Sequence, residues 1–370
     1  MLVVAALCIL ILAYTYAGYP IAIALFARVF PLRPTLDPGY TPKVSVIMTV
    51  YNGASFMDAK LASLVAMDWP ADKLEILVYS DGSTDASDDL VRAFAARDPR
   101  VRLVRAEDRA GKPSGINRLA AVATGEALLL TDVRQPLSRG ALRAMAALLA
   151  DPAVGCVSGN LVLEGAAGSG VYWRYEKFIR KQEARFRSLV GVSGSITLMR
   201  RADLVPLPAD VVLDDMWIPM RLRLLGRRIL FAQDAEAYDV AFEDDREFGR
   251  KVRTLAGNYQ LFAMMPKLLS PFHNPSWFET ISHKVLRLVC PFALLVLAAA
   301  SWGAGELEHG ELARAIGAAL MAGQGLFYFA AVVGPRAGRI GSLARTFVVM
   351  NAAALFGLGR FVGGRQRITW

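Results

Sequence analysis

The sequence is poor in cysteine and histidine, with three of each among 370 residues. Cys8, Cys156 and Cys290 lie far apart, and two of them fall in candidate membrane segments. A disulfide framework or a cysteine-ligated metal site needs closely spaced cysteines, so the sequence indicates neither. His273 and His283 are also isolated, and we expect them at the surface or the membrane interface, not as metal ligands.

A nucleic-acid-binding motif is also missing, although the net charge is +9. Much of the excess positive charge stands near the ends of apolar segments, as at Lys284, Arg287, Arg336 and Arg339. Anionic lipid headgroups attract such residues. We therefore expect a lipid bilayer as a partner, and no nucleic acid.

Charge is almost absent from Leu2 to Phe30, which contains only Arg28. A run of about 20 apolar residues can span a bilayer. No basic segment precedes the run, as it would in a cleaved signal peptide, so residues 1–30 are predicted to be a retained anchor. The first cations beyond Ala27 are Arg28, Arg33 and Lys43, which predicts a cytoplasmic location for the domain that follows.

The C-terminal part, residues 285–370, contains three more apolar stretches: Val285 to Trp302, Ala313 to Val333 and Leu343 to Val362. The last of them contains Arg345, Asn351 and Arg360, and it either spans the membrane or is re-entrant or interfacial. Residues 264–284 combine prolines with Trp277 and Phe278, which is typical of an interfacial segment. The sequence predicts a multi-pass membrane protein with four hydrophobic segments.

The middle of the chain alternates strand and helix signals. Short aliphatic runs predict strands at Val44 to Val50, Leu74 to Ser80, Val101 to Val104 and Glu126 to Asp132. Helix-like segments start near Gly53, Thr84, Lys112 and Leu137. This order predicts an α/β fold with a mostly parallel, doubly wound sheet, whose ligands bind beyond the carboxyl ends of the strands.

Polar residues follow three of these strands directly: Tyr51 and Asn52 after the first, Asp81 after the second, and Asp132 with Arg134 after the fourth. Asp81, in "SDGSTD", either belongs to a capped turn or accepts hydrogen bonds from a nucleobase or ribose.

Two further motifs carry charged or polar groups. "GKPSGIN" places Lys112 and Asn117 at the start of a helix, where an anion can bind, although it does not match the P-loop pattern. "VVLDDMWIPMRL" places Asp214 and Asp215 at another helix start. Adjacent acids repel, which raises one pKa towards the range of a general base, although acids at helix starts also serve as caps.

In their order and spacing, "VSVIMTVYNGA", "EILVYSDGSTD", "GKPSGIN", the strand ending in "TD" and "LDDMWIPMRL" resemble the membrane-anchored glycosyltransferases of family 2, which have a GT-A fold. The resemblance covers about Pro42 to Gly257 and implies a cytoplasmic catalytic domain over residues 31–263, here in a bacterial inner membrane. It implies an inverting transfer from a nucleotide diphosphate sugar, by default a UDP-sugar, to a saccharide or lipid-linked acceptor. It assigns Asp215 as general base and Asp214 as its neighbour. Donor contacts are expected from Tyr51, Asn52, Asp81, Lys112, Asn117, Asp132 and Arg134.

The chain departs from the family where a D-x-D motif is expected, because it has Asp132-Val133-Arg134. Either Arg134 contacts the donor phosphates, or it points away and Asp132 binds the metal with another acid or the diphosphate. We expect a divalent cation, Mg²⁺ or Mn²⁺, since hard oxygen ligands and diphosphate suit both.

A second departure lies where processive relatives carry Q-x-x-R-W. This chain has Arg250 and Arg253 but lacks both the Gln and the Trp, which puts processive synthesis in doubt. Arg250 and Arg253 are predicted on the diphosphate side, and Ser193 and Gly194, from "GVSGSITLMRR", on the acceptor side. Trp173 and Trp217 could replace the missing aromatic platform, although packing is the commoner role for Trp173.

Two other function classes remain. A transporter would place its polar chemistry within the membrane, whereas here it lies in the middle domain. A catalytically impaired regulator that only binds nucleotide sugars is harder to distinguish from an enzyme. "DVR" lacks the second acid of the D-x-D motif, and the altered arginine motif lacks its Gln and Trp. The retained pair Asp214-Asp215 favours catalysis.

Overall fold

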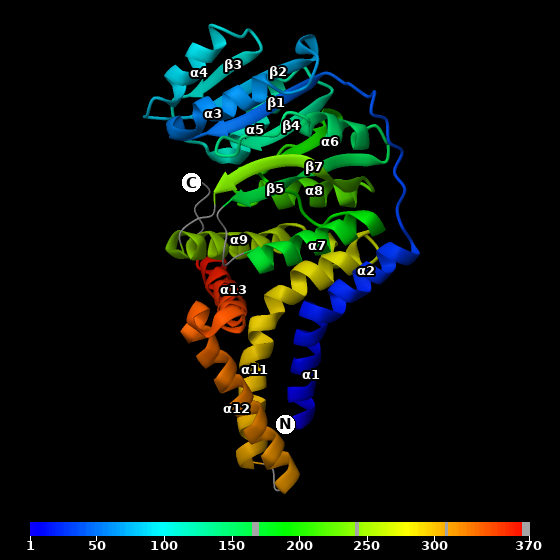
Figure 1. The fold of residues 1–370 in the computed structure, drawn as a ribbon, viewed down its shortest axis with the longest axis vertical. Coiled ribbons are helices and arrows are strands. Elements are labelled where there is room, and N and C mark those ends of the chain that lie inside the picture. The colour runs from blue at the N-terminus through cyan, green and yellow to red at the C-terminus, as the bar shows by residue number, and fades with distance from the viewer. Residues whose placement is uncertain (165–169, 241–243, 308–309, 365–370) are drawn as a thin grey trace.

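The computed structural model describes residues 1–164, 170–240, 244–307 and 310–364. An α/β body forms one end of the molecule, and helices from both ends of the chain form a narrower stalk below it (Figure 1). Residues 365–370 of the predicted C-terminal part lie outside the described residues.

A single seven-stranded sheet forms the centre of the body. Its strands have the spatial order β3-β2-β1-β4-β6-β5-β7. Pairing is parallel from β3 to β4 and between β5 and β7, and β6 is antiparallel to both of its neighbours. The strands are β1 (Val44–Val50), β2 (Leu74–Asp81), β3 (Val101–Ala106), β4 (Ala127–Asp132), β5 (Val154–Glu164), β6 (Thr197–Arg200) and β7 (Arg228–Val240).

Helices cover both faces of this sheet because alternate strand residues point to opposite sides. Val46 and Met48 of β1 pack in one core cluster with α3 (Ala54–Val65), α4 (Ser87–Ala95) and α6 (Ala141–Leu149). Ile47 packs in the other cluster with α5 (Gly111–Val122) and α8 (Asp214–Leu224). The predicted mostly parallel α/β fold is confirmed, including all four predicted strands.

The sequence did not predict β5 and β7. Both strands contain residues that weaken a strand pattern, namely Gly155 and Gly159 in β5 and the polar stretch Gln233 to Glu236 in β7. They form because they pair with each other across register shifts at Gly155 and Gly159.

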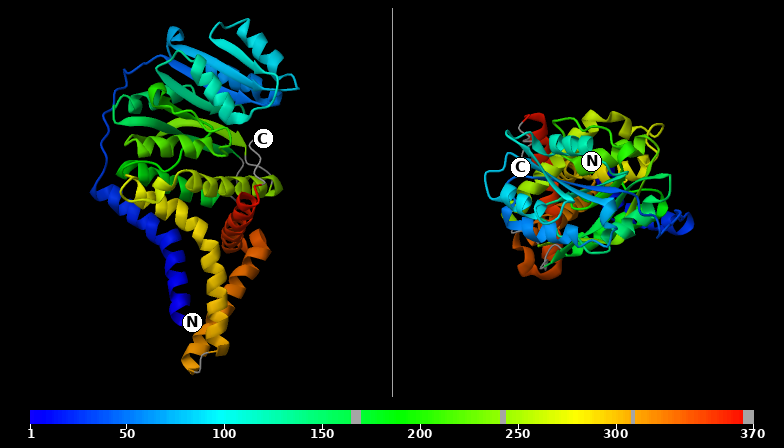
Figure 2. Two further views of the ribbon diagram at one scale, coloured as in Figure 1. Left: turned by 180° about the vertical axis from the view of Figure 1, so that it is seen from behind. Right: turned by 90° about the horizontal axis from the view of Figure 1, so that it is seen from above.

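Two long helices separate the sheet from the stalk, α7 (Gly170–Phe186) and α9 (Asp244–Met264), as Figure 2 shows from behind. Tyr19 and Ile23 pack on Ile179 of α7. Val252 and Leu255 of α9 pack on Leu288 and on residues near the C-terminus. The α/β body and the stalk therefore share a hydrophobic interface.

Three segments of the described chain are long and apolar enough to cross a membrane: Leu2–Val29, Trp277–Glu306 and Glu311–Val362. Within them lie α1 (Leu2–Ala13), a short π-helix (Tyr14–Gly18), α2 (Tyr19–Val29), α10 (Trp277–Glu279), a second short π-helix (Thr280–Val285), α11 (Leu286–Leu307), α12 (Glu311–Val333) and α13 (Gly338–Val362). Short 3₁₀ turns occur at Ala71–Lys73, Arg201–Asp203, Pro266–Leu269 and Gly334–Ala337.

The predicted third and fourth hydrophobic segments correspond to α12 and α13, which a 3₁₀ turn joins into one continuous stretch. Helix α13 lies directly against α9, and Figure 1 shows it nearly end-on while α11 and α12 run down the stalk. One of the polar residues that made this segment ambiguous, Asn351, donates a hydrogen bond to the hydroxyl of Tyr16 at 3.2 Å.

Candidate functional site

The carboxyl ends of β1, β2 and β4 meet at one edge of the sheet, as parallel pairing requires. Asn52 follows β1 with a φ of +50°, and its Oδ1 accepts a 2.9 Å hydrogen bond from the Thr84 N–H. The guanidinium of Arg109 lies 3.6 Å from the centre of the Tyr51 ring. Tyr51 and Asn52 thus form a partly exposed rim at this edge.

Asp81, at the end of β2, is fully buried. Its carboxylate accepts hydrogen bonds from the backbone N–H groups of Ala110 (2.7 Å) and Gly111 (3.0 Å). Asp81 therefore caps the start of α5 and fixes the neighbouring Lys112. The capping role considered from sequence is present, but for α5 and not for the turn in which Asp81 stands.

We expect Asp81→Ala to lower the free energy of unfolding by about 1 to 3 kcal/mol, because two backbone donors lose a charged acceptor. Chemical denaturation of the purified chain would measure this loss. Asp72→Ala, which removes an exposed acid, is a matched control. An unchanged denaturation midpoint together with weaker nucleotide binding would show that Asp81 serves the ligand alone.

Lys112 lies between two acids from different elements. Its Nζ is 2.8 Å from Asp132 Oδ1 at the end of β4 and 3.0 Å from Asp214 Oδ2 at the start of α8. Burial disfavours the ammonium, but Asp132 and Asp214 outweigh this effect and raise the pKa of Lys112 above its ordinary value. A fixed positive charge therefore joins the predicted metal ligand to the predicted catalytic pair.

Asp215 stands in the first turn of α8, where the helix dipole favours negative charge. Its Oδ1 is buried and has no hydrogen-bond partner among the described residues. Burial, followed by the charge of Asp214, raises the pKa of Asp215 to about 6, although Lys112 opposes the shift. Such a carboxyl group is suited to accept a proton near neutral pH.

Gly194 lies beside both the predicted metal ligand Asp132 and the predicted base Asp215. A Cβ atom at this position would lie 3.6 Å from Asp132 Oδ2 and 3.7 Å from Asp215 Oδ2. Ser193 is buried beside it, and its hydroxyl is 2.6 Å from that of Ser195. The missing side chain thus keeps the space between Asp132 and Asp215 open for a substrate.

A cavity of about 340 Å³ connects these groups, and its lining includes Asp132, Ser193, Gly194, Asp215 and Arg250. Arg250 is joined by Thr254 and Asn258, which follow at intervals of one helical turn along α9. The structure therefore brings predicted donor-side and acceptor-side residues to one cavity.

Arg134 binds elsewhere. Its Nε is 2.7 Å from Asp239 Oδ1, and its Nη2 donates to the Val240 carbonyl at 2.9 Å, both at the end of β7. Asp239 also accepts a hydrogen bond from the Gln135 amide at 2.8 Å. Arg134 thus fastens the turn after β4 to β7, in keeping with the alternative in which it points away from the donor. Metal binding by Asp132 stays a prediction.

Several predicted site residues do not line the cavity, among them Asn117, Trp217 and Arg253. Asn117 was expected to contact the donor, but its amide makes two hydrogen bonds with the backbone of Leu207, at 2.8 and 2.9 Å. Trp217 was expected near the acceptor, but it is buried in the core cluster of α5 and α8 because it faces the sheet. Arg253 does not line the cavity, since it is one residue out of phase with Thr254 on α9.

His283 was expected at the surface or the membrane interface, but it is 1% exposed. Its ring lies between two acids of α7, with Nδ1 2.6 Å from Glu183 and Nε2 3.2 Å from Glu176. Glu176 also accepts a hydrogen bond from Arg287. The signal available in the sequence was the seven-residue interval between Glu176 and Glu183, which places both on one helix face.

Sequence reasoning also missed a buried cation behind the strand-end motif. Lys60 of α3 is fully buried and donates to the Thr131 hydroxyl and the Gln135 carbonyl, each at 2.6 Å. Burial lowers the pKa of Lys60 to about 7, against the opposing effect of Asp132. Lys60 therefore holds both sides of the turn that presents Asp132.

The residues at Asp132 fit a divalent cation only in part. In the part of the chain that the structure describes, no group of three or more acids, histidines or cysteines could hold a metal ion. Asp132 has one oxygen on Lys112, and its side chain is 39% exposed. It can therefore offer one hard oxygen to a cation whose other ligands come from a diphosphate and water, a common arrangement for Mg²⁺.

Comparison with known proteins agrees with this geometry. Residues 45–205 match the family described as "Glycosyl transferase family 2". Over its whole length the chain resembles the structure of "Mannosyltransferase PcManGT from Pyrobaculum calidifontis in complex with GDP-Man and Mn2+", with a TM-score of 0.77, 26% identity and coverage of 98% of this chain and 99% of that one.

Two curated relatives match over shorter regions. An N-acetylglucosaminyltransferase of Rhizobium meliloti (strain 1021) is 27% identical over 45% of this chain, and glycosyltransferase AglE of Haloferax volcanii is 26% identical over 52% of it. The aligned regions span 41% and 65% of these relatives. Residues 45–205 therefore carry a glycosyl transferase family 2 domain, and the chain has a GT-A-like fold.

Proposed function

We propose that this chain is an inverting glycosyltransferase that moves a sugar from a nucleotide diphosphate sugar to a hydroxyl group of an acceptor at the membrane surface. The observation that carries the proposal is Asp215, a half-buried acid with a raised pKa at the wall of the cavity that Asp132 also lines.

The reaction needs one general base and positive charge beside the leaving diphosphate. The acceptor oxygen attacks the anomeric carbon while Asp215 accepts its proton, and the bond to the nucleoside diphosphate breaks. Because the acceptor attacks the face opposite the leaving group in a single displacement, the anomeric configuration is inverted. A positioned base contributes typically 10²–10⁴-fold to the rate. Lys112 adds positive charge beside the leaving diphosphate and orients Asp214.

Asp132 would hold a divalent cation together with the donor diphosphate. The Pyrobaculum protein was solved with GDP-Man and Mn²⁺, which supports Mn²⁺ or Mg²⁺ here. When bound, such a cation neutralises charge on the leaving diphosphate. The donor base is open between uridine, from the sequence resemblance, and guanosine, from this structural neighbour.

The alternative is a regulator that binds nucleotide sugars without turnover. Purified full-length chain in detergent, with membrane lipid extract as a source of acceptor, can be incubated with UDP-glucose, UDP-N-acetylglucosamine or GDP-mannose. We expect release of nucleoside diphosphate from at least one donor. Nucleotide binding by calorimetry without release from any donor would favour the regulator.

Arg134 tests how the altered motif works. We expect Arg134→Asp to leave the Mn²⁺ concentration for half-maximal activity unchanged, because the Arg134 side chain is engaged at the end of β7. The same variant should lose about 1 to 3 kcal/mol of unfolding free energy, since buried Asp239 loses its partner. Arg134→Gln removes the charge without adding an acid and serves as the control. A tighter metal dependence in Arg134→Asp alone would show that the side chain faces the cation.

A further inference from the structure

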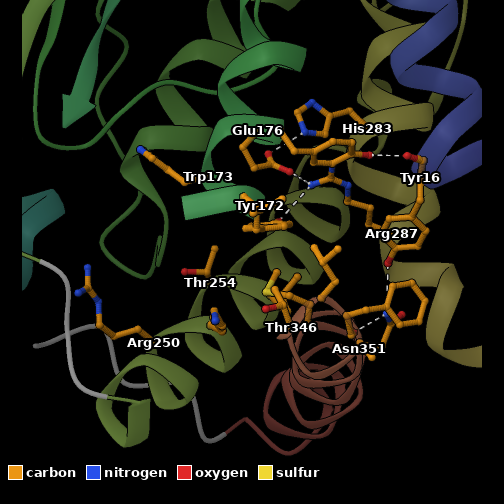
Figure 3. Close-up of a pocket in the computed structure, with 18 of the residues that line it drawn as sticks. Tyr16, Tyr172, Trp173, Glu176, Arg250, Thr254, His283, Arg287, Thr346 and Asn351 are labelled. Carbon is orange, nitrogen blue, oxygen red and sulfur yellow. Dashed lines mark hydrogen bonds and ion pairs between the residues drawn. The ribbon is translucent and has the colours of Figure 1, made fainter. Parts of the chain in front are cut away.

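A second and larger cavity of about 850 Å³ lies between α7, α9, α11 and α13, where the body meets the stalk (Figure 3). Its floor is mainly apolar, with Val171, Phe327, Leu343, Phe347 and Met350 among its lining residues. A space of this size lined by aliphatic and aromatic side chains suits a hydrocarbon chain.

This cavity is continuous with the catalytic one. Trp173, Thr254 and Lys284 line both, and the smaller cavity continues to Asp215. An occupant of the larger cavity can therefore extend a polar end towards the general base while its apolar part stays beside the membrane helices.

Two cations line the larger cavity, Lys284 and Arg287. Lys284 lines both cavities, and no acid of the described chain lies within ion-pair distance of its ammonium. Arg287 pairs with Glu176 through Nη1, but its Nε and Nη2 are buried and have no hydrogen-bond partner among the described residues. Buried donors without acceptors are costly, so this arrangement fits a ligand that supplies anionic oxygen atoms.

The apolar lining and the two cations together define one kind of occupant. A soluble saccharide would not bury the apolar lining of the cavity. A neutral lipid would leave the Nε and Nη2 donors of Arg287 without an acceptor. We infer that the larger cavity holds the acceptor of the proposed transfer as an amphiphile, with its hydrocarbon chain among α9, α12 and α13 and its phosphate on Lys284 and Arg287. This assignment rests on the proposed function.

The test measures binding of radiolabelled farnesyl phosphate, a short isoprenoid phosphate, to the full chain in detergent. We expect binding that farnesol and inorganic phosphate compete with at least tenfold more weakly than unlabelled farnesyl phosphate. Lys284→Gln should weaken binding roughly tenfold, the usual size of a lost charge-assisted hydrogen bond. Lys267→Gln, at an exposed lysine, should have no effect.

A cavity-filling variant provides a test that is independent of charge. Thr346→Phe narrows the larger cavity (Figure 3) and should reduce farnesyl phosphate binding, while Ala319→Phe on the exposed face of α12 should not. Equal binding by all four variants, or competition by inorganic phosphate as strong as by farnesyl phosphate, would overturn the assignment.

Nucleotide release, measured on the same preparations, separates the two proposals. Release from a donor without farnesyl phosphate binding would reject only the lipid acceptor. Farnesyl phosphate binding without release from any donor would reject the transferase reaction instead.

Discussion

Asp215→Asn should lower sugar transfer by roughly a hundredfold or more while donor binding is retained, because a general base acts in the transition state and not in the ground state. The amide preserves the size of the side chain but cannot accept the proton. The buried Oδ1 of Asp215 has no hydrogen-bond partner in the described structure, so the substitution should cost little stability.

The pH dependence of the wild type provides a second measurement of the same residue. Asp215 must be ionised to act, and its pKa is raised to about 6. Activity should therefore be constant above that value and fall as the pH decreases through it. Asp210→Asn, at an exposed acid in the loop before α8, is the matched control and should keep both rate and profile. Unchanged turnover in Asp215→Asn would reject the assignment of the base.

Lys112→Met should have the second largest effect, a loss of roughly a hundredfold, which is typical when a preorganised charge is removed from a developing anion. Without the ammonium, Asp132 and Asp214 lose their shared partner and repel each other. Lys112 also lowers the pKa of Asp215, so its removal should move the acid limb of the pH profile to higher pH.

Two variants decide whether Lys112 acts through its charge. Lys112→Arg should recover part of the rate and return the pH profile towards that of the wild type. Lys43→Met, at an exposed lysine before β1, should change neither. A pH profile of Lys112→Met identical to that of the wild type would mean that Lys112 does not act on the catalytic pair.

The sequence predicted the part of the fold that local patterns determine. Strands β1, β2 and β4 are mostly apolar runs, and each ends in a polar turn, so the edge of the sheet that carries the candidate site could be predicted from the sequence. Strands β5 and β7 could not be predicted in the same way, because they are stabilised by pairing with each other and not by their own composition.

The sequence predicted which residues belong to the candidate site, but not which of them contact one another. Asp132, Lys112 and Asp214 were each singled out, yet their contact through one ammonium depends on how α5 and α8 pack on the sheet. The backbone contact of Asn117 could not be predicted, because a polar residue near a helix start can bind backbone as readily as ligand. Lys284 and Arg287 were assigned to lipid headgroups, since nothing local to them shows that α7 and α9 enclose them.

The stereochemistry of the product tests the central proposal most directly. The full chain can be given an α-linked nucleotide diphosphate sugar, and the configuration of the new glycosidic bond determined by proton NMR. A single displacement assisted by Asp215 predicts a β-linked product that forms in step with release of nucleoside diphosphate. An α-linked product, or release of nucleoside diphosphate with no glycoside formed, would contradict it.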